Sequence, residues 1–171
     1  AERFNKTYGE TFVVPQPMIK KTGARIMALD DPTKKMSKSS GSAKSYISLS
    51  DDDTTIAKKI RSATTDSEGT VGYDPAKRPG ISNLVTICSE LTGSSPAQII
   101  AEFEGKGYKE FKEALAQVLI DFIAPIRERQ RELLSDKAGL VKILNDGSAK
   151  ARDITGKKMK DVREKLGIVL G

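Results

Sequence analysis

Apolar side chains recur at steps of three and four residues between Tyr108 and Ile126, and this spacing constrains the fold more than any other feature of the chain. The run consists of Tyr108, Phe111, Leu115, Val118, Phe122 and Ile126. Such spacing places side chains on one face of an α-helix. Pro125 has no N–H to donate to the carbonyl of Asp121, so it should bend this helix without ending the apolar face. The run predicts a long core helix. A cofactor groove would need converging polar groups, which the run lacks.

The segment after residue 49 begins with a strong helix-start signal. Ser50 can cap a helix that has three aspartates in its first turn and Lys58, Lys59 and Arg61 in its last turn, which suits the helix dipole at both ends. Consecutive helical residues point about 100° apart, so the three aspartates cannot converge on one metal ion. We therefore interpret them as capping residues, and the sequence predicts no metal site.

Glycine and proline divide the rest of the chain into helices and loops. The segment Gly105-Lys106-Gly107 lacks the full phosphate-loop pattern, so we expect it to connect two helices. Glycines and prolines between residues 64 and 80 predict a loop. Further helices are predicted over residues 82–91, from residue 96, and over residues 149–166.

The first 49 residues carry extended signals instead. The apolar runs at 12–14 and 25–29 are short, and Pro15 and Pro17 follow the first of them. We expect both runs to be edges of a larger sheet. Ala1 opens the chain in place of methionine, and residues 1–6 are typical of the end of a helix. The chain is therefore expected to be a fragment of a longer protein.

Composition excludes several kinds of chemistry. The chain has no histidine, which removes Ser-His and Cys-His catalysis and any zinc site that uses histidine. Cys88 is the single cysteine, so an internal disulfide is impossible and a cytoplasmic protein is expected. No run of residues is long and apolar enough to predict a membrane span. The net charge of +6 favours a polyanionic partner.

A five-residue signature follows the second apolar run and a Pro turn. Lys35-Met36-Ser37-Lys38-Ser39 matches the KMSKS motif of class I aminoacyl-tRNA synthetases without a break. Lysines gathered among small hydroxyl residues need an anion as a partner, because like charges repel. A charged, solvated surface loop is the alternative interpretation of these five residues.

The surrounding sequence resembles bacterial-type tryptophanyl-tRNA synthetases. The resemblance is carried by residues 23–39, 59–63, 65–69, 79–84 and 104–108, and it covers essentially the whole chain. The family often continues KMSKS with Asp-Pro-Asn, whereas Ser40-Gly41-Ser42 stands here. The resemblance implies a mainly α chain in two parts. Residues 1–49 would be the end of a Rossmann-type α/β catalytic domain that carries the KMSKS loop, and residues 50–171 a bundle-like helical domain that binds the tRNA anticodon.

The resemblance also implies a reaction. Such an enzyme activates L-tryptophan with ATP to tryptophanyl-adenylate and transfers the acyl group to tRNA(Trp), as a homodimer. Lys35 and Lys38 would stabilise the pyrophosphate that leaves. The ATP site would comprise Ile26, Lys35, Met36, Ser37, Lys38 and Ser39, with Ile26 against the adenine and Mg²⁺ accompanying the phosphates. The tryptophan pocket and the HIGH-type motif belong to the other half of such an enzyme, so the fragment should be inactive alone.

Two further interpretations do not involve catalysis. The chain could be a tRNA-binding or interdomain helical module, with a basic face on its last helix as the RNA contact. The candidate tRNA-binding residues are Lys150, Arg152, Lys157, Lys158 and Lys160. The chain could also be a basic helical domain with no nucleic-acid role, which would show an RNA affinity that does not depend on salt.

Overall fold

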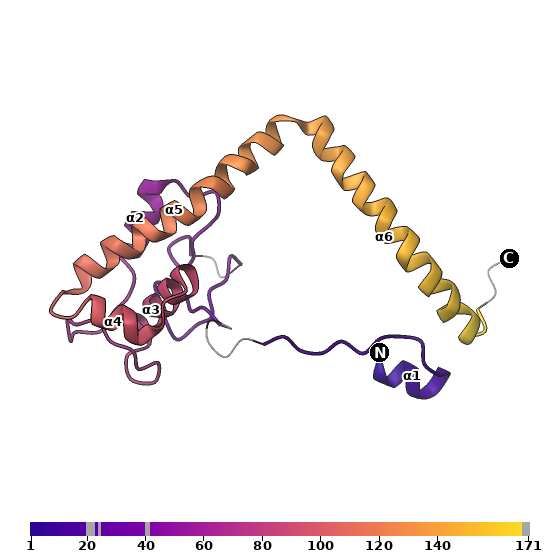
Figure 1. The fold of residues 1–171 in the computed structure, drawn as a ribbon, viewed down its shortest axis with the longest axis horizontal. Helices are drawn as coiled ribbons and strands as arrows, with labels where there is room; N and C mark the ends of the chain where they lie inside the picture. The colour runs from indigo at the N-terminus through magenta and orange to yellow at the C-terminus, as the bar shows by residue number, and fades with distance from the viewer. Residues whose placement is uncertain (20–22, 24, 40–41, 169–171) are drawn as a thin grey trace. The chain divides into compact units, whose positions relative to one another are not determined.

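A computed structural model describes residues 1–19, 23, 25–39 and 42–168 of the chain. These residues form two compact units, one of Ile19–Gln130 and one of Ala1–Met18 with Arg131–Gly171. The predicted loop exit at Ser40-Gly41, and residues 20–22 and 24 of the predicted extended region, lie outside the described residues. The helices are α1 (Glu2–Tyr8), α2 (Asp53–Arg61), α3 (Pro79–Thr92), α4 (Pro96–Glu102), α5 (Tyr108–Ser135) and α6 (Lys137–Lys165) (Figure 1).

The mainly α fold class is confirmed, but the two predicted sheet edges do not form strands in the described part of the chain. The pairing there is limited to isolated bridges, Met27 with Lys35 and Thr70 with Gly107. Val13 is 92% exposed. A strand is stable only when neighbouring strands take up its backbone groups. The described residues supply one such neighbour for Met27 and none for Val13.

Helix α2 begins later than its sequence predicted. Asp52, not Ser50, is the N-cap, and its side chain accepts a hydrogen bond from the Thr55 N–H at 2.7 Å. Asp51 is engaged elsewhere, because its carboxylate accepts from the Ser48 N–H at 2.9 Å and pairs with Lys59 Nζ at 2.6 Å. The acidic start and basic end of the helix remain as expected.

Helices α3 and α4 begin and end close to the residues that the sequence predicted. Pro79 starts α3 three residues earlier than predicted, since proline suits the first turn of a helix. Gly93 ends α3 in the left-handed conformation, with φ of 76°, which glycine adopts at little cost. Ser95 and Gln98 then form a reciprocal capping box at the start of α4.

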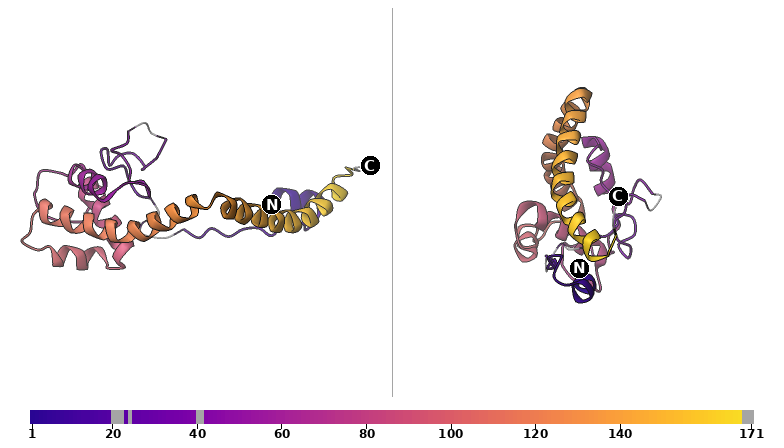
Figure 2. Two further views of the ribbon diagram at one scale, coloured as in Figure 1. Left: turned by 90° about the horizontal axis from the view of Figure 1, so that it is seen from above. Right: turned by 90° about the vertical axis from the view of Figure 1, so that its right-hand side faces the viewer.

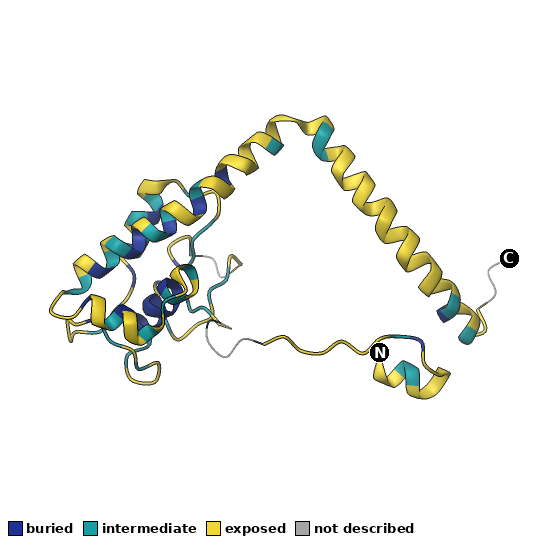
Figure 3. Cartoon of the chain, viewed as in Figure 1, coloured by how far each residue is buried: buried dark blue, intermediate teal, exposed yellow. Residues whose placement is uncertain are grey.

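The core of the 19–130 unit lies between α2, α3, α4 and α5. Buried residues gather on α3 and on one side of α5 (Figure 3). Phe111 and Leu115 are fully buried as predicted, but Phe122 is 51% and Ile126 38% exposed. The buried face of α5 instead continues through Ala116, Leu119 and Ile123. The face with Phe122 and Ile126 and the face with Leu119 and Ile123 are both apolar in sequence. Spacing alone therefore could not identify the buried face.

Arg127 continues the inward face of α5 and fastens it to the start of α2. Its Nη1 donates to the Asp51 carbonyl at 2.6 Å, and its Nη2 donates to Asp53 Oδ1 at 2.6 Å. The residue is 9% exposed. Figures 1 and 2 show α2 beside α5, and these bonds join the two helices.

The second unit combines α1 with the last helix. Helix α6 begins at Lys137, twelve residues before the predicted start, because Asp136 caps it by accepting from the Gly139 N–H at 2.9 Å. Asn5 folds the segment after α1 back, since its side chain bonds the backbone of Thr11 and Phe12. Val162 is the buried residue of α6, whereas Ile154 is 70% exposed.

Candidate active site

The KMSKS residues leave the protein core through a short antiparallel hairpin. The Met36 N–H donates to the Ile26 carbonyl at 3.0 Å, and the Ala28 N–H donates to the Lys34 carbonyl at 2.8 Å. Ile26 and Met36 are half-buried and pack against the core. The hairpin therefore joins two of the predicted ATP-site residues, Ile26 and Met36, and directs the remainder of the motif away from the core.

Asp31 organises the turn of this hairpin. Its carboxylate accepts from the Thr33 N–H at 3.1 Å and from the Thr33 hydroxyl, and it pairs with Lys34 Nζ at 2.8 Å. The hydrogen bond from Lys34 lowers the pKa of the Asp31 carboxyl to about 2. The same contact raises the pKa of the Lys34 ammonium group. The first of the three lysines thus has a carboxylate partner within the turn.

Lys35 and Lys38 differ from Lys34 in this respect. Both are exposed, and neither forms an ion pair with a carboxylate of the described residues. The Ser39 N–H donates to Ser37 Oγ at 3.2 Å, which turns the chain between the two serines. The motif therefore presents two exposed ammonium groups, beside the hydroxyls of half-buried Ser37 and exposed Ser39. This donor set suits phosphate oxygens.

The opposite edge of the Ile26–Leu29 segment is held by residues that sequence reasoning did not assign to the site. The side chain of Asn83, on α3, bonds both the N–H and the carbonyl of Met27. The Leu29 N–H donates to the Ser45 carbonyl at 2.9 Å, and the Leu29 carbonyl accepts from the Thr64 N–H at 2.7 Å. An asparagine within a helical segment gives no sign of a partner 56 residues away.

The basic residues of α6 do not share one face. At about 100° per residue, Lys150, Lys157 and Lys160 fall within an arc of about 80°, whereas Arg152 lies about 120° from the middle of that arc. Lys157 pairs with Asp153 at 3.3 Å. The Lys158 Nζ donates to the Thr11 carbonyl at 2.6 Å, so this side chain is already used within its own unit.

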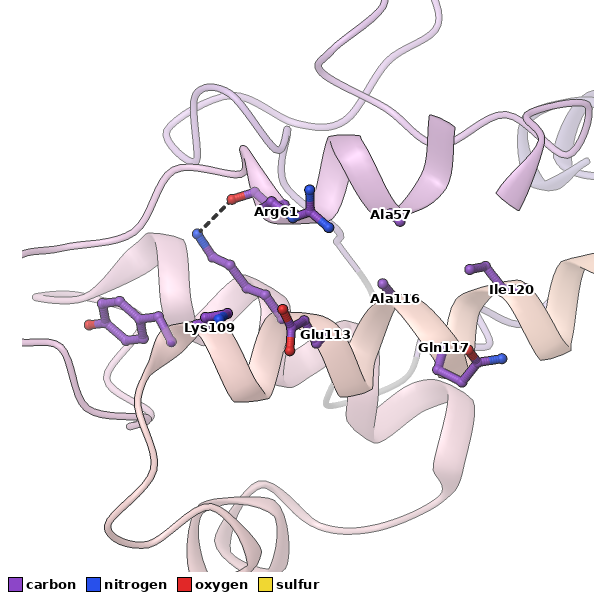
Figure 4. A pocket seen from close by; sticks show the side chains of 9 residues that line it. Ala57, Arg61, Lys109, Glu113, Ala116, Gln117 and Ile120 are labelled. Carbon is purple, nitrogen blue, oxygen red and sulfur yellow. Dashed lines mark hydrogen bonds between the residues drawn. The ribbon is translucent and has the colours of Figure 1, made fainter. Parts of the chain in front are cut away.

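A cavity of about 360 Å³ lies between α2 and α5. Its apolar lining includes Ala57 on α2 and Ala116 and Ile120 on α5, and the charged side chains of Arg61 and Lys109 also line it (Figure 4). Lys112 in its wall donates to the Ala63 carbonyl at 2.7 Å, and burial lowers the pKa of its ammonium group. No residue predicted for the site lies in this cavity.

Neither a metal-binding cluster nor a membrane-spanning helix is found among the described residues. Across 1–19, 23, 25–39 and 42–168, no group of three His, Cys, Asp or Glu side chains could hold a metal ion. Over the same ranges, none of the helices combines the length and the apolar character that crossing a membrane would require.

The family of the chain is established by comparison with known proteins. The family described as tRNA synthetases class I (W and Y) matches residues 1–124. The chain therefore belongs to the class I tRNA synthetases of the tryptophan and tyrosine type. Among its curated relatives, the tryptophan-tRNA ligase of Halalkalibacterium halodurans is 49% identical over 98% of this chain and 51% of the relative. The tryptophan-tRNA ligase of Wolinella succinogenes is 50% identical over 99% of this chain and 51% of the relative.

The chain is also similar to solved structures of tryptophanyl-tRNA synthetases. Tryptophanyl-tRNA synthetase from Mycoplasma pneumoniae matches with a TM-score of 0.87 and 29% identity, over 99% of this chain and 51% of that one. The Campylobacter jejuni enzyme complexed with ADP and tryptophan matches with a TM-score of 0.65 and 29% identity, over 98% and 51%. The chain thus spans about half the length of the relatives it matches.

Proposed function

We propose that the chain is the C-terminal half of a tryptophan-tRNA ligase. The whole enzyme would activate L-tryptophan with ATP and transfer it to tRNA(Trp). One observation carries the catalytic part of this proposal: Lys34 pairs with Asp31 within the turn of the hairpin, whereas Lys35 and Lys38 are exposed and have no carboxylate partner among the described residues. The names of the curated relatives support tryptophan as the amino acid.

The chemistry follows from those two charges. The tryptophan carboxylate attacks the α-phosphorus of ATP, the bond from that phosphorus to the bridging oxygen breaks, and pyrophosphate leaves with the electron pair. Negative charge grows on the pyrophosphate as this bond breaks. Ammonium groups of Lys35 and Lys38 placed against it lower the barrier when they bind the transition state more tightly than ATP. Ser37 and Ser39 would add hydroxyl or backbone donors, and Ile26 and Met36 would adjoin the nucleotide.

Magnesium would enter this site with the ATP phosphates. The two ammonium groups of the motif fit phosphate oxygens and repel a cation. The nearby Asp31 carboxylate is occupied by Lys34 and Thr33. Mg²⁺ is commonly held by substrate phosphates with few protein ligands, and we assign it no ligand in this chain.

The remaining parts of the proposal concern organisation. We assign residues 1–49 to the end of the catalytic domain and residues 50–171 to the helical anticodon-binding domain. The tryptophan pocket would be supplied by the rest of the enzyme, so this chain alone would not activate tryptophan. The enzyme would work in the cytoplasm as a homodimer.

The catalytic proposal is tested by three lysine variants of the full-length enzyme. Lys35→Ala and Lys38→Ala should each slow adenylate formation by roughly 10²–10³-fold, the scale of removing one preorganised donor. Lys34→Ala is the matched control, and it should cost less than about ten-fold because Asp31 already neutralises that charge. The assay is ATP–pyrophosphate exchange with tryptophan, and with tyrosine to check the amino acid. Equal reductions in all three variants, or near-normal exchange in Lys35→Ala and Lys38→Ala, would refute these roles.

A second role, tRNA binding by α6, is favoured by the arc of Lys150, Lys157 and Lys160, together with Arg152 and Lys158 as weaker candidates. Replacing the three lysines of the arc by Gln should flatten the dependence of tRNA(Trp) affinity on salt, by about one unit of slope for each phosphate that a lysine no longer neutralises. Lys142→Gln is the comparison and should change the slope less, since Lys142 Nζ lies 2.6 Å from Asp146, closer than the 3.3 Å that separates Lys157 from Asp153. A wild-type affinity that does not change with salt would contradict this role.

A further inference from the structure

We propose that Asn83 is a positioning residue for the ATP-binding loop. Its carboxamide holds Met27 and thereby fixes the hairpin that presents Lys35. This inference deepens the proposed function and rests on it for the link to ATP. The grip on the hairpin itself can be tested without any enzymatic activity.

The contact pairs one side chain with a complete backbone edge. Asn83 Oδ1 accepts from the Met27 N–H at 2.8 Å, and Asn83 Nδ2 donates to the Met27 carbonyl at 2.9 Å. Asn83 is 6% exposed. A carboxamide carries an acceptor oxygen and a donor NH₂ group side by side, much as a neighbouring strand offers a carbonyl and an N–H. It can therefore complete both backbone bonds of a single residue.

The geometry of an antiparallel pair explains how the bonds from Asn83 to Met27 affect the position of Lys35. In the hairpin, Ala28 bonds Lys34 and Ile26 bonds Met36, which leaves Met27 and Lys35 as a directly opposed pair. In such a pair the backbone groups of Met27 point to the other edge, which is where Asn83 lies. The segment around Met27 is therefore bonded on both edges. Without the bonds from Asn83 it could shift relative to α3.

The start of α3 is a firm base for this contact. Its neighbours Ile81, Leu84 and Val85 are at most 1% exposed. A side chain on Gly80 would place Cβ 2.4 Å from the Thr64 carbonyl, so the helix approaches that loop closely. The same Thr64 donates to the Leu29 carbonyl at 2.7 Å. Asn83 thus projects from a fully buried part of α3 onto the segment that carries the motif.

A general need for buried polar groups to be satisfied would also place an asparagine in such a contact. Ser82 offers a matched control for that explanation, because it is 2% exposed and its hydroxyl accepts from the Asp74 N–H at 2.9 Å. It lies on the same turn of α3 and does not bond the hairpin. Ser82→Ala therefore removes a buried side-chain bond without releasing Met27.

The first test measures hydrogen exchange in this chain by NMR. In Asn83→Ala, the amides of Ala28 and Met36, which close the hairpin, should exchange about ten-fold faster than in the wild type, the factor expected for removing one or two ordinary hydrogen bonds. Rates are compared with those of core amides in α5, so that a global drop in stability is recognised. Ser82→Ala should leave the two hairpin amides at their wild-type rates. Unchanged rates in Asn83→Ala, or equal acceleration in Ser82→Ala, would overturn the inference.

The second test uses ATP–pyrophosphate exchange in the full-length enzyme. Asn83→Ala and Asn83→Asp should raise KM for ATP about ten-fold with little change in KM for tryptophan. The aspartate keeps the acceptor for the Met27 N–H but turns an oxygen toward the Met27 carbonyl, so it should not rescue. Equal rises in both KM values would indicate a merely structural role and overturn the inference. A wild-type enzyme without tryptophan-dependent exchange would refute the proposed function and the link to ATP, whereas faster amide exchange would still support the grip on the hairpin.

Discussion

Replacing Asp66 by Asn should lower the free energy of unfolding by about 3 kcal/mol, because Asp66 is the main partner of a largely buried guanidinium group. Arg78 donates to the two Asp66 carboxylate oxygens at 2.9 and 3.2 Å, to the Thr70 carbonyl at 2.6 Å and to the Tyr108 hydroxyl at 2.8 Å. The Tyr108 hydroxyl in turn donates to Asp66. The Arg78 and Asp66 side chains are 14% and 24% exposed.

The magnitude follows from these contacts. Hydrogen bonds to charged groups contribute about 1.5–3 kcal/mol each, and breaking a buried pair costs roughly 3–5 kcal/mol. Partial exposure of Asp66 reduces both figures, which leaves about 2–4 kcal/mol. Glu68 provides the comparison, since it contacts the same Arg78 at 3.1 Å but is 59% exposed. Glu68→Gln should therefore cost no more than about 1 kcal/mol.

Urea unfolding of the chain, followed by circular dichroism and extrapolated linearly to water, measures both variants. The pH dependence gives an independent check. The hydrogen bond from Arg78 lowers the pKa of Asp66 in the folded state below the ordinary value of 3.8. Its stabilisation is therefore complete above pH 3.8 and disappears as the pH falls toward the folded-state pKa. The difference between wild type and Asp66→Asn should stay constant from about pH 8 to pH 5 and shrink below about pH 4. Equal costs for Asp66→Asn and Glu68→Gln, or a difference that grows in acid, would refute the reasoning.

Two other pairs of substitutions test the packing. Phe111 is fully buried and Phe122 is 51% exposed, so Phe111→Ala should cost about 3–5 kcal/mol and Phe122→Ala less than about 1 kcal/mol in the same urea assay; the reverse order would place the wrong arc of α5 in the core. A Cβ at Gly80 would lie 2.4 Å from the Thr64 carbonyl, whereas one at Gly147 meets nothing within 4 Å. In thermal melts Gly80→Ala should lower Tm, and Gly147→Ala should stabilise α6 by about 0.5–1 kcal/mol; similar shifts in both would contradict the close approach at Gly80.

Local signals predicted the helices well where they were unambiguous. Gly93 and the pair Ser95-Pro96 mark real helix ends because their conformational preferences act within a few residues. The start of α2 was misplaced because Ser50, Asp51 and Asp52 are all competent caps. Bonds from Lys59 and Ser48 occupy Asp51, and such choices depend on the tertiary structure.

The site was predictable only in part, for a similar reason. KMSKS is contiguous, so the sequence indicates Lys35 and Lys38 directly as candidates, and their catalytic role stays a prediction. Spacing could not indicate that Lys34 is neutralised by Asp31, since that depends on the geometry of the turn. Nor could it assign Asn83 or Arg127, whose partners lie 56 and more residues away. Long-range polar contacts leave no periodic trace in a sequence.

The carboxamide of Asn83 also bears on how the chain matures. An unpaired backbone edge is a template on which another chain can add a strand. Met27 and its neighbours are synthesised well before residue 83, so until α3 folds the outer edge of the hairpin is open to intermolecular pairing. Once Asn83 docks, it ends the ladder, because a side chain offers no further backbone groups for another strand to join. The side chain of Asn83 thus occupies the two backbone groups of Met27 to which another strand would otherwise bond.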